Sequence, residues 1–518
     1  MNSLKVPQAH SPTKSDPNLL TVVSRSDLAS PRILMVFVCM LLIFAGAAQP
    51  ITDTDFWWHL RTGQYIVETR SIPHTDIFSS IKFGSEWIAH EWLSEVAMFA
   101  IWKLTGFIGL IASFALIVTA AFVILYRRCV VRSVHPYVAL FAVLFGAVAS
   151  ISTWGVRPHI FSVLFASSSI AVLESFARRE MGIAIWWLVP LIVIWTNAHA
   201  GFVIGLALIA LSIVGLLADR LLLSEERHAD DWKRVWTLVF LLAACIAVVV
   251  FNPNGTRLFT YPLETLTSPA MMRYIEEWRS PNFHELRFQG LLLLLIATFS
   301  ALVLSKNKIR PRDLIMLAAT TWATLRSARN VWLFVLVAVP LFAEAFSSFI
   351  WTYFPLRASD LAEQRKSGAA ARGQAYANAT ILLLCVILVG LGVRRAANRQ
   401  PIVEAEQFPI NAIEFLKSER LAQPQYNEYE WGGYLIWKLY PQYKVYIDGR
   451  ADVYGNKQLE VFFNVHEGNL GWRDVLDRDN IRTVFVRPSI PLASLLRSNE
   501  DSWEKVFEDK QAVIFRRR

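Results

Sequence analysis

The chain carries Ile51-Thr-Asp-Thr-Asp-Phe-Trp-Trp-His-Leu60 directly after its first apolar run, so two acids, three aromatic rings and a histidine lie beside a membrane segment. Further along comes His90-Glu-Trp-Leu-Ser-Glu95, which adds a second histidine and two more acids. Charged groups close to a bilayer are costly and are usually retained for a function. The two stretches therefore predict a polar, functional loop, residues 51–105, that follows the first membrane span.

The composition predicts a membrane protein. Of the 518 residues, 54% are hydrophobic and only 18% are charged, and the mean hydropathy is +0.38. Soluble domains carry nearer a quarter charged residues. The net charge of +9 comes from short basic clusters beside apolar runs, which is typical of topology signals and argues against nucleic acid as a partner. The four cysteines lie in or beside apolar runs, so we expect no disulfide framework and no cysteine metal site.

The apolar runs predict the number of membrane spans, because about 18 to 20 residues cross a bilayer as a helix. Eleven stretches are candidates, the ninth being short: 33–50, 106–126, 136–153, 158–176, 182–198, 200–222, 234–252, 288–305, 313–325, 330–350 and 377–393. Residues 91–104 are amphipathic and are expected to lie along the membrane surface. The predicted fold class is an all-α polytopic membrane protein with about eleven transmembrane helices and a C-terminal extracytoplasmic α/β domain.

Basic residues in the loops predict the orientation. With the N-terminus in the cytoplasm, the inside loops hold most of the lysine and arginine, as the positive-inside rule requires. These residues are Arg127, Arg128, Arg132, Arg178, Arg179, Arg220, Arg227, Lys233, Arg234, Lys306, Lys308, Arg310, Arg312, Arg357, Arg365, Lys366 and Arg372. The loop 51–105 and the C-terminal tail then lie in the periplasm of a bacterial inner membrane. Arg394 and Arg395 argue against the last crossing.

Three regions follow from these patterns. Residues 1–32 are polar and are expected to be a disordered cytoplasmic tail, 33–398 form the transmembrane domain, and 399–518 form a periplasmic α/β domain. Within the last region, Asp448-Gly-Arg450-Ala-Asp452 is expected to hold the domain together as an Asp–Arg–Asp network, with ligand binding as the alternative. Its predicted helices are 411–419 and 433–439, and its predicted strands are 444–447, 483–486 and 512–515.

Polar residues gather at the predicted outside ends of the spans, which indicates one shared cavity at that face. The candidate site residues are Asp53, Asp55, His59, His90, Glu91, Arg157, His159, His199, Arg326 and Arg329. A carboxylate such as Asp55 or Asp53 can accept a proton from a hydroxyl group. Guanidinium groups can hold a phosphate and neutralise it. These residue types suit the transfer of a sugar from a polyprenyl-phosphate carrier.

Structural roles stay open for several of these residues. Arg157-Pro-His159 has the pattern of a helix entry with proline in the first turn. Glu91 and Glu95 have the spacing of one solvated helix face, and Asn197 and His199 could satisfy each other. A zinc-binding H-E-x-x-H motif is not met at His90-Glu-Trp-Leu-Ser94, because serine stands where the second histidine is needed.

Several short stretches resemble the GT-C glycosyltransferases, membrane proteins that use lipid-phosphate sugars. They are Asp53-Thr-Asp-Phe-Trp-Trp-His-Leu60, Ile72-Pro-His-Thr-Asp-Ile-Phe-Ser79, His90-Glu-Trp-Leu-Ser-Glu95, Asn252-Pro-Asn-Gly255, Glu277-Trp-Arg-Ser-Pro281, Arg329-Asn330, Trp431-Gly-Gly-Tyr434 and Ile447-Asp-Gly-Arg-Ala-Asp452. The resemblance implies that Asp55, directly before the aromatic cluster, is the base and that Asp53 is a second acid. Members of the group often have adjacent acids in this loop, whereas Thr54 intervenes here, so the roles of base and helper stay open.

The expected function is that of an inverting membrane glycosyltransferase. It would move a sugar from a polyprenyl-phosphate donor in the bilayer to a cell-envelope glycan, lipid or protein. One alternative is a transporter or flippase for a lipid-linked glycan, which would need charges in mid-span. Another is a non-catalytic envelope scaffold. No cofactor is required by the residues, and a divalent metal between the two acids is left open.

Overall fold

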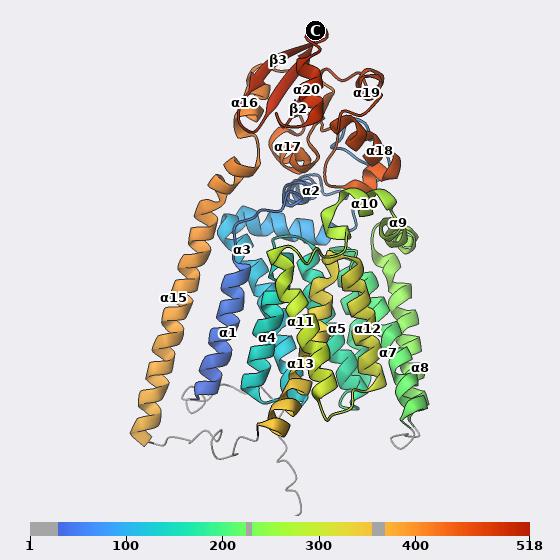
Figure 1. Cartoon of the computed structure of the whole chain (residues 1–518). Coiled ribbons are helices and arrows are strands. Elements are labelled where there is room, and N and C mark those ends of the chain that lie inside the picture. Colours follow the sequence, from blue (N-terminus) through green and yellow to red (C-terminus); the bar gives the residue numbers. More distant parts are fainter. Residues whose placement is uncertain (1–29, 224–229, 355–367) are drawn as a thin grey trace, which may run out of the picture.

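A computed structural model describes residues 30–223, 230–354 and 368–518, and most of them form helices (Figure 1). The predicted tail over 1–29 and the basic loop residues Arg227, Arg357, Arg365 and Lys366 lie outside these ranges. Helix α1 already begins at Pro31, inside the predicted tail, because its apolar run starts there and proline suits the first turn of a helix.

The part of the chain before the sheet is helical, with most of its long helices gathered in a bundle. They are α1 (Pro31–Ala47), α2 (Phe56–Thr69), α3 (Trp92–Val131), α4 (Pro136–Ser150), α5 (His159–Ala177), α6 (Leu188–Ala198), α7 (Phe202–Leu222), α8 (Asp231–Ala247), α9 (Tyr261–Leu266), α10 (Pro269–Tyr274), α11 (Leu286–Leu304), α12 (Pro311–Arg326), α13 (Val331–Tyr353) and α15 (Gly368–Gln407). Among the described residues, eight helices are long and apolar enough to cross a membrane. The protein is therefore a multi-pass membrane protein.

The count of eleven spans is not confirmed, although each predicted span falls on a helix. The predicted spans 33–50, 182–198 and 313–325 fall on helices that are shorter than the others, namely α1, α6 with the short turn before it, and α12. α12 is only weakly apolar, because threonines and charged residues interrupt its sequence. Local hydrophobicity alone does not settle whether such helices cross the bilayer.

A kink at Gly106 divides α3 into two parts. The glycine has φ 63° and ψ −155°, a conformation that residues with a Cβ rarely adopt. Figure 1 shows the part before the kink running across the end of the bundle, and the part after it continuing into the bundle. The first part coincides with the stretch 91–104 that was predicted to lie along the membrane surface.

Buried and half-buried charges tie the helices together at the end of the bundle away from loop 51–105. Arg128 of α3 pairs with Glu174 of α5 at 2.8 Å, and Arg132 pairs with the same Glu174 at 3.0 Å. Arg132 also reaches Asp313 at 3.1 Å and Glu344 at 3.0 Å. Removing one member of such a buried group leaves an uncompensated charge. The network therefore fixes α3, α5, α12 and α13 relative to one another.

The C-terminal part contains a four-stranded sheet in the order β1-β2-β4-β3. β1 and β2 are parallel, and the other neighbouring pairs are antiparallel. Its elements are α16 (Ile410–Ser418), β1 (Gln425–Asn427), α17 (Gly432–Leu439), α18 (Ala451–His466), α19 (Trp472–Arg478), β2 (Thr483–Val486), α20 (Pro491–Arg497), β3 (Trp503–Glu508) and β4 (Val513–Arg517). The predicted helices correspond to α16 and α17, and the predicted strands 483–486 and 512–515 correspond to β2 and β4.

The predicted strand 444–447 is wrong. Instead of joining the sheet, Val445 forms an isolated bridge with Ser79 of loop 51–105. The amide of Val445 donates to the carbonyl of Phe78 at 3.1 Å, and the amide of Ser80 donates to the carbonyl of Val445 at 2.8 Å. A β-branched run that finds a partner outside its own domain still satisfies its backbone groups.

A buried ion pair joins the same two regions. Arg450 contacts Asp76 at 2.8 Å and Asp448 at 2.7 Å, and all three side chains are almost fully buried. The network that holds this region is therefore Asp76–Arg450–Asp448, and not the expected set within 448–452. In addition, α15 continues without a break to Gln407, so residues 398 and 399 lie inside one helix.

Candidate active site

A cavity of about 1850 Å³ lies between the helical bundle and the C-terminal region. Its walls include all ten residues that the sequence indicated, together with residues of α7, α12, α13 and the C-terminal region. The ten are Asp53, Asp55, His59, His90, Glu91, Arg157, His159, His199, Arg326 and Arg329. They come from segments far apart in the chain, and each lies at or near a helix end that faces this cavity.

Arg157, just before α5, is the centre of an acidic cluster. Its guanidinium lies 2.7 Å from Asp55, 3.4 Å from Asp53 and 3.1 Å from Glu277. Arg329 reaches the same Glu277 at 3.3 Å. Three carboxylates thus share two guanidinium groups, so one negative charge is left without a matching positive charge inside this cluster.

The two carboxylates closest to Arg157, those of Asp55 and Glu277, have very different pKa values. Burial, reinforced by Asp53 and Glu277 and opposed by Arg157, raises the pKa of Asp55 to about 7. Glu277 is half-buried, and Arg157 and Arg329 outweigh the effect of that burial and lower its pKa to about 2. At neutral pH, Glu277 is therefore a permanent anion, whereas Asp55 can both bind and release a proton. This is the behaviour required of a general base.

Arg326 and Arg329 form another wall of the cavity. Arg326 is the last residue of α12, is exposed, and has its Nη2 3.5 Å from the sulfur of Met272. No carboxylate lies within ion-pair distance of Arg326 in the described part of the chain. Arg329 lies with its guanidinium carbon 5.3 Å from the centre of the Trp278 ring. Arg326 is therefore the guanidinium of this wall that is most available to an anion.

Three histidines surround Glu91. The Nε2 atoms of His90 and His199 lie 3.2 Å and 3.4 Å from Glu91 Oε1, and Nδ1 of His59 lies 3.5 Å from Glu91 Oε2. Although its own burial opposes this, the histidines hold the pKa of Glu91 well below its usual range. Glu91 is thus a buried anion, and the alternative of a solvated helix face is wrong for it and for Glu95, since both are buried.

The surroundings of His199 fix its tautomer. The amide of Gly201 donates to Nδ1 at 2.9 Å, and the hydroxyl of Ser162 lies 2.7 Å from the same atom. Burial lowers the pKa of His199 well below its usual range. A neutral ring that accepts at Nδ1 carries its proton on Nε2, which lies 3.4 Å from Glu91 Oε1 and 3.5 Å from Nη2 of Arg329. The sequence had left open a pairing of His199 with Asn197. Among the described residues this pairing does not occur.

His159 is the first residue of α5, and its Nε2 donates to the carbonyl of Thr153 at 2.8 Å. This bond ties the entry of α5 to the end of the preceding turn. The helix-entry role that the sequence left open for Arg157-Pro-His159 therefore applies to His159. Arg157 instead reaches into the acidic cluster.

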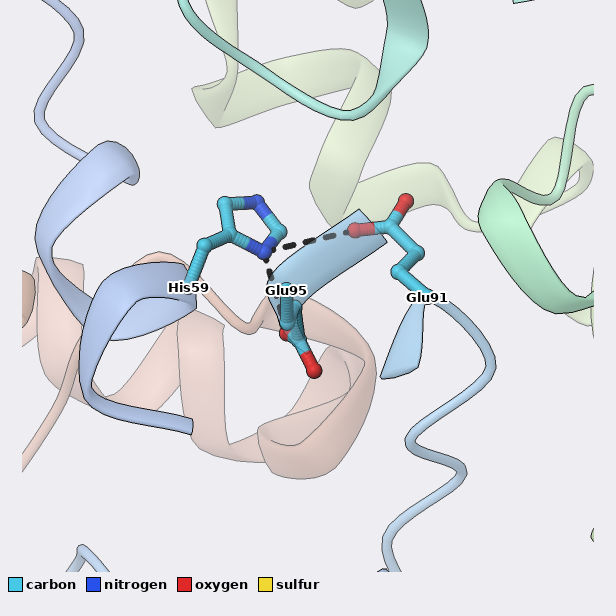
Figure 2. A group of neighbouring side chains, drawn as sticks. All are labelled: His59, Glu91 and Glu95. Carbon is cyan, nitrogen blue, oxygen red and sulfur yellow. Dashed lines mark hydrogen bonds and ion pairs between the residues drawn. The ribbon is translucent and has the colours of Figure 1, made fainter. Parts of the chain in front are cut away.

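A second acidic group lies next to Glu91. Figure 2 shows His59 of α2 with its ring nitrogen pointing toward both Glu91 and Glu95. The distance from His59 Nδ1 to Glu95 Oε1 is 3.1 Å. In the described ranges, these three residues are the group whose ligand atoms lie close enough together to hold a metal ion. Asp53 and Asp55 do not belong to this group. The cation nearest to them is the guanidinium of Arg157.

The C-terminal region closes the cavity directly over Asp55. A Cβ atom on Gly449 would lie 1.7 Å from Oδ1 of Asp55, so no side chain fits at this position. Glycine is therefore required here by close approach. Tyr429, Asp452 and Glu277 also line the cavity. The motifs that contain Gly449, Asp452 and Glu277 carried the resemblance, but nothing local in the sequence indicated that they reach Asp55 or Arg157.

Glycines also allow α17 to pack against the start of α2. A Cβ on Gly433 would lie 2.6 Å from the carbonyl oxygen of Thr54, and one on Gly432 would lie 2.2 Å from that of Ile447. The Trp431-Gly-Gly-Tyr434 motif therefore lets the C-terminal region press against the segment that carries Asp53 and Asp55.

No protein-family model matches the sequence, and no curated protein sequence matches it. Solved structures do match the fold. The oligosaccharyltransferase of Archaeoglobus fulgidus, in the form tethered to an acceptor peptide, aligns with a TM-score of 0.55 and 12% identity, over 88% of this chain and 69% of that one. The same oligosaccharyltransferase in the apo form aligns with a TM-score of 0.53 and 12% identity, over 87% and 69% of the two chains.

A bacterial structure, ArnT from Cupriavidus metallidurans bound to undecaprenyl phosphate, aligns with a TM-score of 0.45 and 13% identity over 93% of this chain and 97% of that one. The two alignments with the archaeal protein cover 87% and 88% of the present chain. The chain therefore has the fold of the GT-C class of membrane glycosyltransferases.

Proposed function

We propose that the protein is an inverting glycosyltransferase that moves a sugar from a polyprenyl-phosphate donor to a cell-envelope acceptor. One observation carries this proposal. A single cavity places a carboxylate with a pKa of about 7, Asp55, in the same enclosure as Arg329 and as Arg326, whose guanidinium has no carboxylate partner in the described ranges. A base and an anion-binding wall are the two elements that this reaction needs.

The reaction assigns one task to each group. Asp55 accepts the proton of the acceptor hydroxyl, whose oxygen forms a bond to the anomeric carbon of the sugar. The bond between that carbon and the phosphate oxygen breaks, and polyprenyl phosphate leaves with the additional negative charge. Arg326 and Arg329 neutralise this charge. Arg157, held by Asp53 and Glu277, keeps Asp55 in place.

The remaining walls suit the lipid part of the donor. Side chains of α7, α12 and α13 line the cavity where it continues into the bundle, among them Leu208, Leu211, Trp322 and Leu333. A polyprenyl chain is a pure hydrocarbon, so its transfer from lipid to such a wall costs little free energy. The polar groups described above then meet the phosphate and the sugar at the mouth of this apolar part.

The basic residues at the helix ends support a periplasmic location for the site. The buried arginines of the network around Arg132 lie at the end of the bundle opposite the cavity. Because basic residues favour the cytoplasmic side, we place the cavity at the periplasmic face of a bacterial inner membrane. The acceptor would then be an envelope glycan, lipid or protein. Most charges of the candidate site lie near helix ends, which disfavours a transporter.

The test measures polyprenyl phosphate, because every donor sugar yields this product. Membranes with equal amounts of each variant receive a set of undecaprenyl-phosphate sugars and an envelope extract from a deletion strain. Asp55→Asn should lower product release by about two to four orders of magnitude, the usual worth of a positioned base. Arg329→Lys should retain more activity than Arg329→Ala, because it keeps the charge but loses the planar fork.

A matched control is Glu276→Gln. Glu276 lines the same cavity, is exposed and pairs with Arg287, away from the Arg157 cluster, so its replacement should leave release unchanged. Unchanged release in both Asp55→Asn and Asp53→Asn would refute the transfer mechanism and favour the scaffold.

A further inference from the structure

The cluster of His59, Glu91 and Glu95 is not explained by the transfer reaction. His59 lies on α2 one turn after Asp55, and the two glutamates lie one turn apart at the start of α3. All three side chains are nearly or fully buried. Burying two carboxylates side by side is costly unless a proton or a cation compensates them.

The partners of the two glutamates differ. Glu91 Oε1 is approached by the Nε2 atoms of His90 and His199. Within the described ranges, the Glu95 side chain has one polar contact, the 3.1 Å approach of its Oε1 to His59, and its Oε2 is buried without a hydrogen-bond partner. A buried acceptor without a partner is rare in native proteins and points to a missing proton donor or ion.

The distances between the ligand atoms fit the first shell of a metal ion. His59 Nδ1 lies 3.1 Å from Glu95 Oε1 and 3.5 Å from Glu91 Oε2. Zinc binds nitrogen and oxygen at about 2.0–2.2 Å, so neighbouring ligands lie about 3.0 Å apart at right angles and about 3.4 Å apart in a tetrahedron. The three ligand atoms all lie within 4.8 Å of one another, so small side-chain adjustments bring them around one ion.

We propose that His59, Glu91 and Glu95 bind a divalent transition metal ion at the wall of the cavity, with zinc as the first candidate and manganese as the second. One imidazole and two carboxylates suit these ions better than magnesium, which favours ligands that are all oxygen. His90 and His199 then act on Glu91 from outside the first shell and orient it. His59 and Glu91 line the cavity, so one side of the ion faces it.

This placement separates the metal from the base. Asp53 and Asp55, the acids that the sequence offered for a metal, are held by the guanidinium of Arg157. The proposed ion lies instead between α2 and the start of α3, where it joins two segments whose ends form the cavity. It is independent of the proposed transfer reaction, because its presence is measured without turnover.

The experiment counts metal in the purified full-length protein. The protein in detergent is stripped with a chelator, dialysed against zinc chloride or manganese chloride, washed, and analysed by elemental mass spectrometry. Wild type should hold about one ion per chain, the stoichiometry of a single set of ligands. His59→Ala and Glu95→Gln should lose it. Glu276→Gln, Asp53→Asn and Asp55→Asn should each retain it.

Thermal melting shows whether the variants fold. Zinc should raise the melting temperature of stripped wild type but not that of Glu95→Gln, whose metal-free form should melt at or above that of stripped wild type because a buried charge has been removed. Absence of metal from wild type would overturn the proposal. Retention by both ligand variants, or loss in Asp53→Asn or Asp55→Asn, would place the ion elsewhere and overturn it as well.

Discussion

Replacing Gly449 by alanine tests whether the C-terminal region positions the proposed base. The new Cβ would lie 1.7 Å from Oδ1 and 2.8 Å from Cγ of Asp55. To restore the 3.4 Å at which ordinary contact begins, the carboxylate or the loop must move by about 1.7 Å. The 2.7 Å contact between Asp55 and Arg157 cannot survive a shift of that size in the carboxylate.

The expected result is a loss of turnover without unfolding. A misplacement of about 1 Å in a reacting group costs about 10²-fold in rate, so Gly449→Ala should lower release of polyprenyl phosphate by at least about that factor. Most of the effect should appear in kcat and not in KM for the lipid donor. The walls proposed to bind the lipid lie on α7, α12 and α13, and not on the segment that carries Gly449.

The matched control is Gly155→Ala. Gly155 lines the same cavity, but an added Cβ there meets no atom within 4 Å, so turnover should stay at the wild-type level. The double variant Gly449→Ala with Asp55→Asn should be no slower than Asp55→Asn alone, because the two changes act on one group. Wild-type turnover in Gly449→Ala, or additive losses in the double variant, would refute the positioning role.

Three further predictions follow from the structure. Since burial raises the pKa of Asp55 to about 7, turnover should rise with pH up to about 7 and level off above it as the base form fills; Asp53→Asn removes a negative neighbour and should shift that midpoint to lower pH. Asp448→Ala leaves Arg450 buried without its bidentate partner and should lower the free energy of unfolding by about 3–5 kcal/mol, measured by melting the full-length protein. Glu500→Cys, in a background without native cysteines, should react with an impermeant thiol reagent in spheroplasts, because the sheet lies beyond α2 and α10 (Figure 1), at the end of the bundle proposed to face the periplasm.

Each of these predictions has a result that contradicts it. A flat pH profile between pH 5 and 8 would exclude Asp55 as the titrating base. The control is Asp474→Asn, whose side chain is exposed. Equal melting temperatures for Asp448→Ala and this control would show that the ion pair does not stabilise the fold. Labelling of Glu500→Cys only after the membrane is permeabilised would place the C-terminal region inside.

The contents of the cavity could be predicted from the sequence to an unusual degree, because its residues sit at helix ends. An apolar run fixes where a helix leaves the membrane, and a histidine or arginine at that end must face either water or a polar enclosure. Arg157, His199 and Arg329 were found in this way. Glu277 and Gly449 were not assigned to the site, because each lies in a polar stretch where an acid or a glycine is unremarkable.

The C-terminal region shows the opposite case. The β-rich runs at β2 and β4 were predicted as strands from their local pattern, and they do pair with each other in the sheet. The run 444–447 has the same kind of pattern, yet Val445 pairs with Ser79 of loop 51–105. Strand propensity describes a pleated, half-buried backbone, but it does not say which partner supplies the hydrogen bonds.

The sequence by itself determined that this is a multi-pass membrane protein, because hydrophobicity along a helix is a local property and the bilayer imposes its thickness. It also determined that polar groups gather at one face. Only the tertiary structure decided that Arg157 holds Asp55 and Glu277 together, that Gly449 closes on Asp55, and that Glu95 is buried beside His59. Those contacts join segments far apart in the chain, and their geometry is set by how the helices and the C-terminal region pack together.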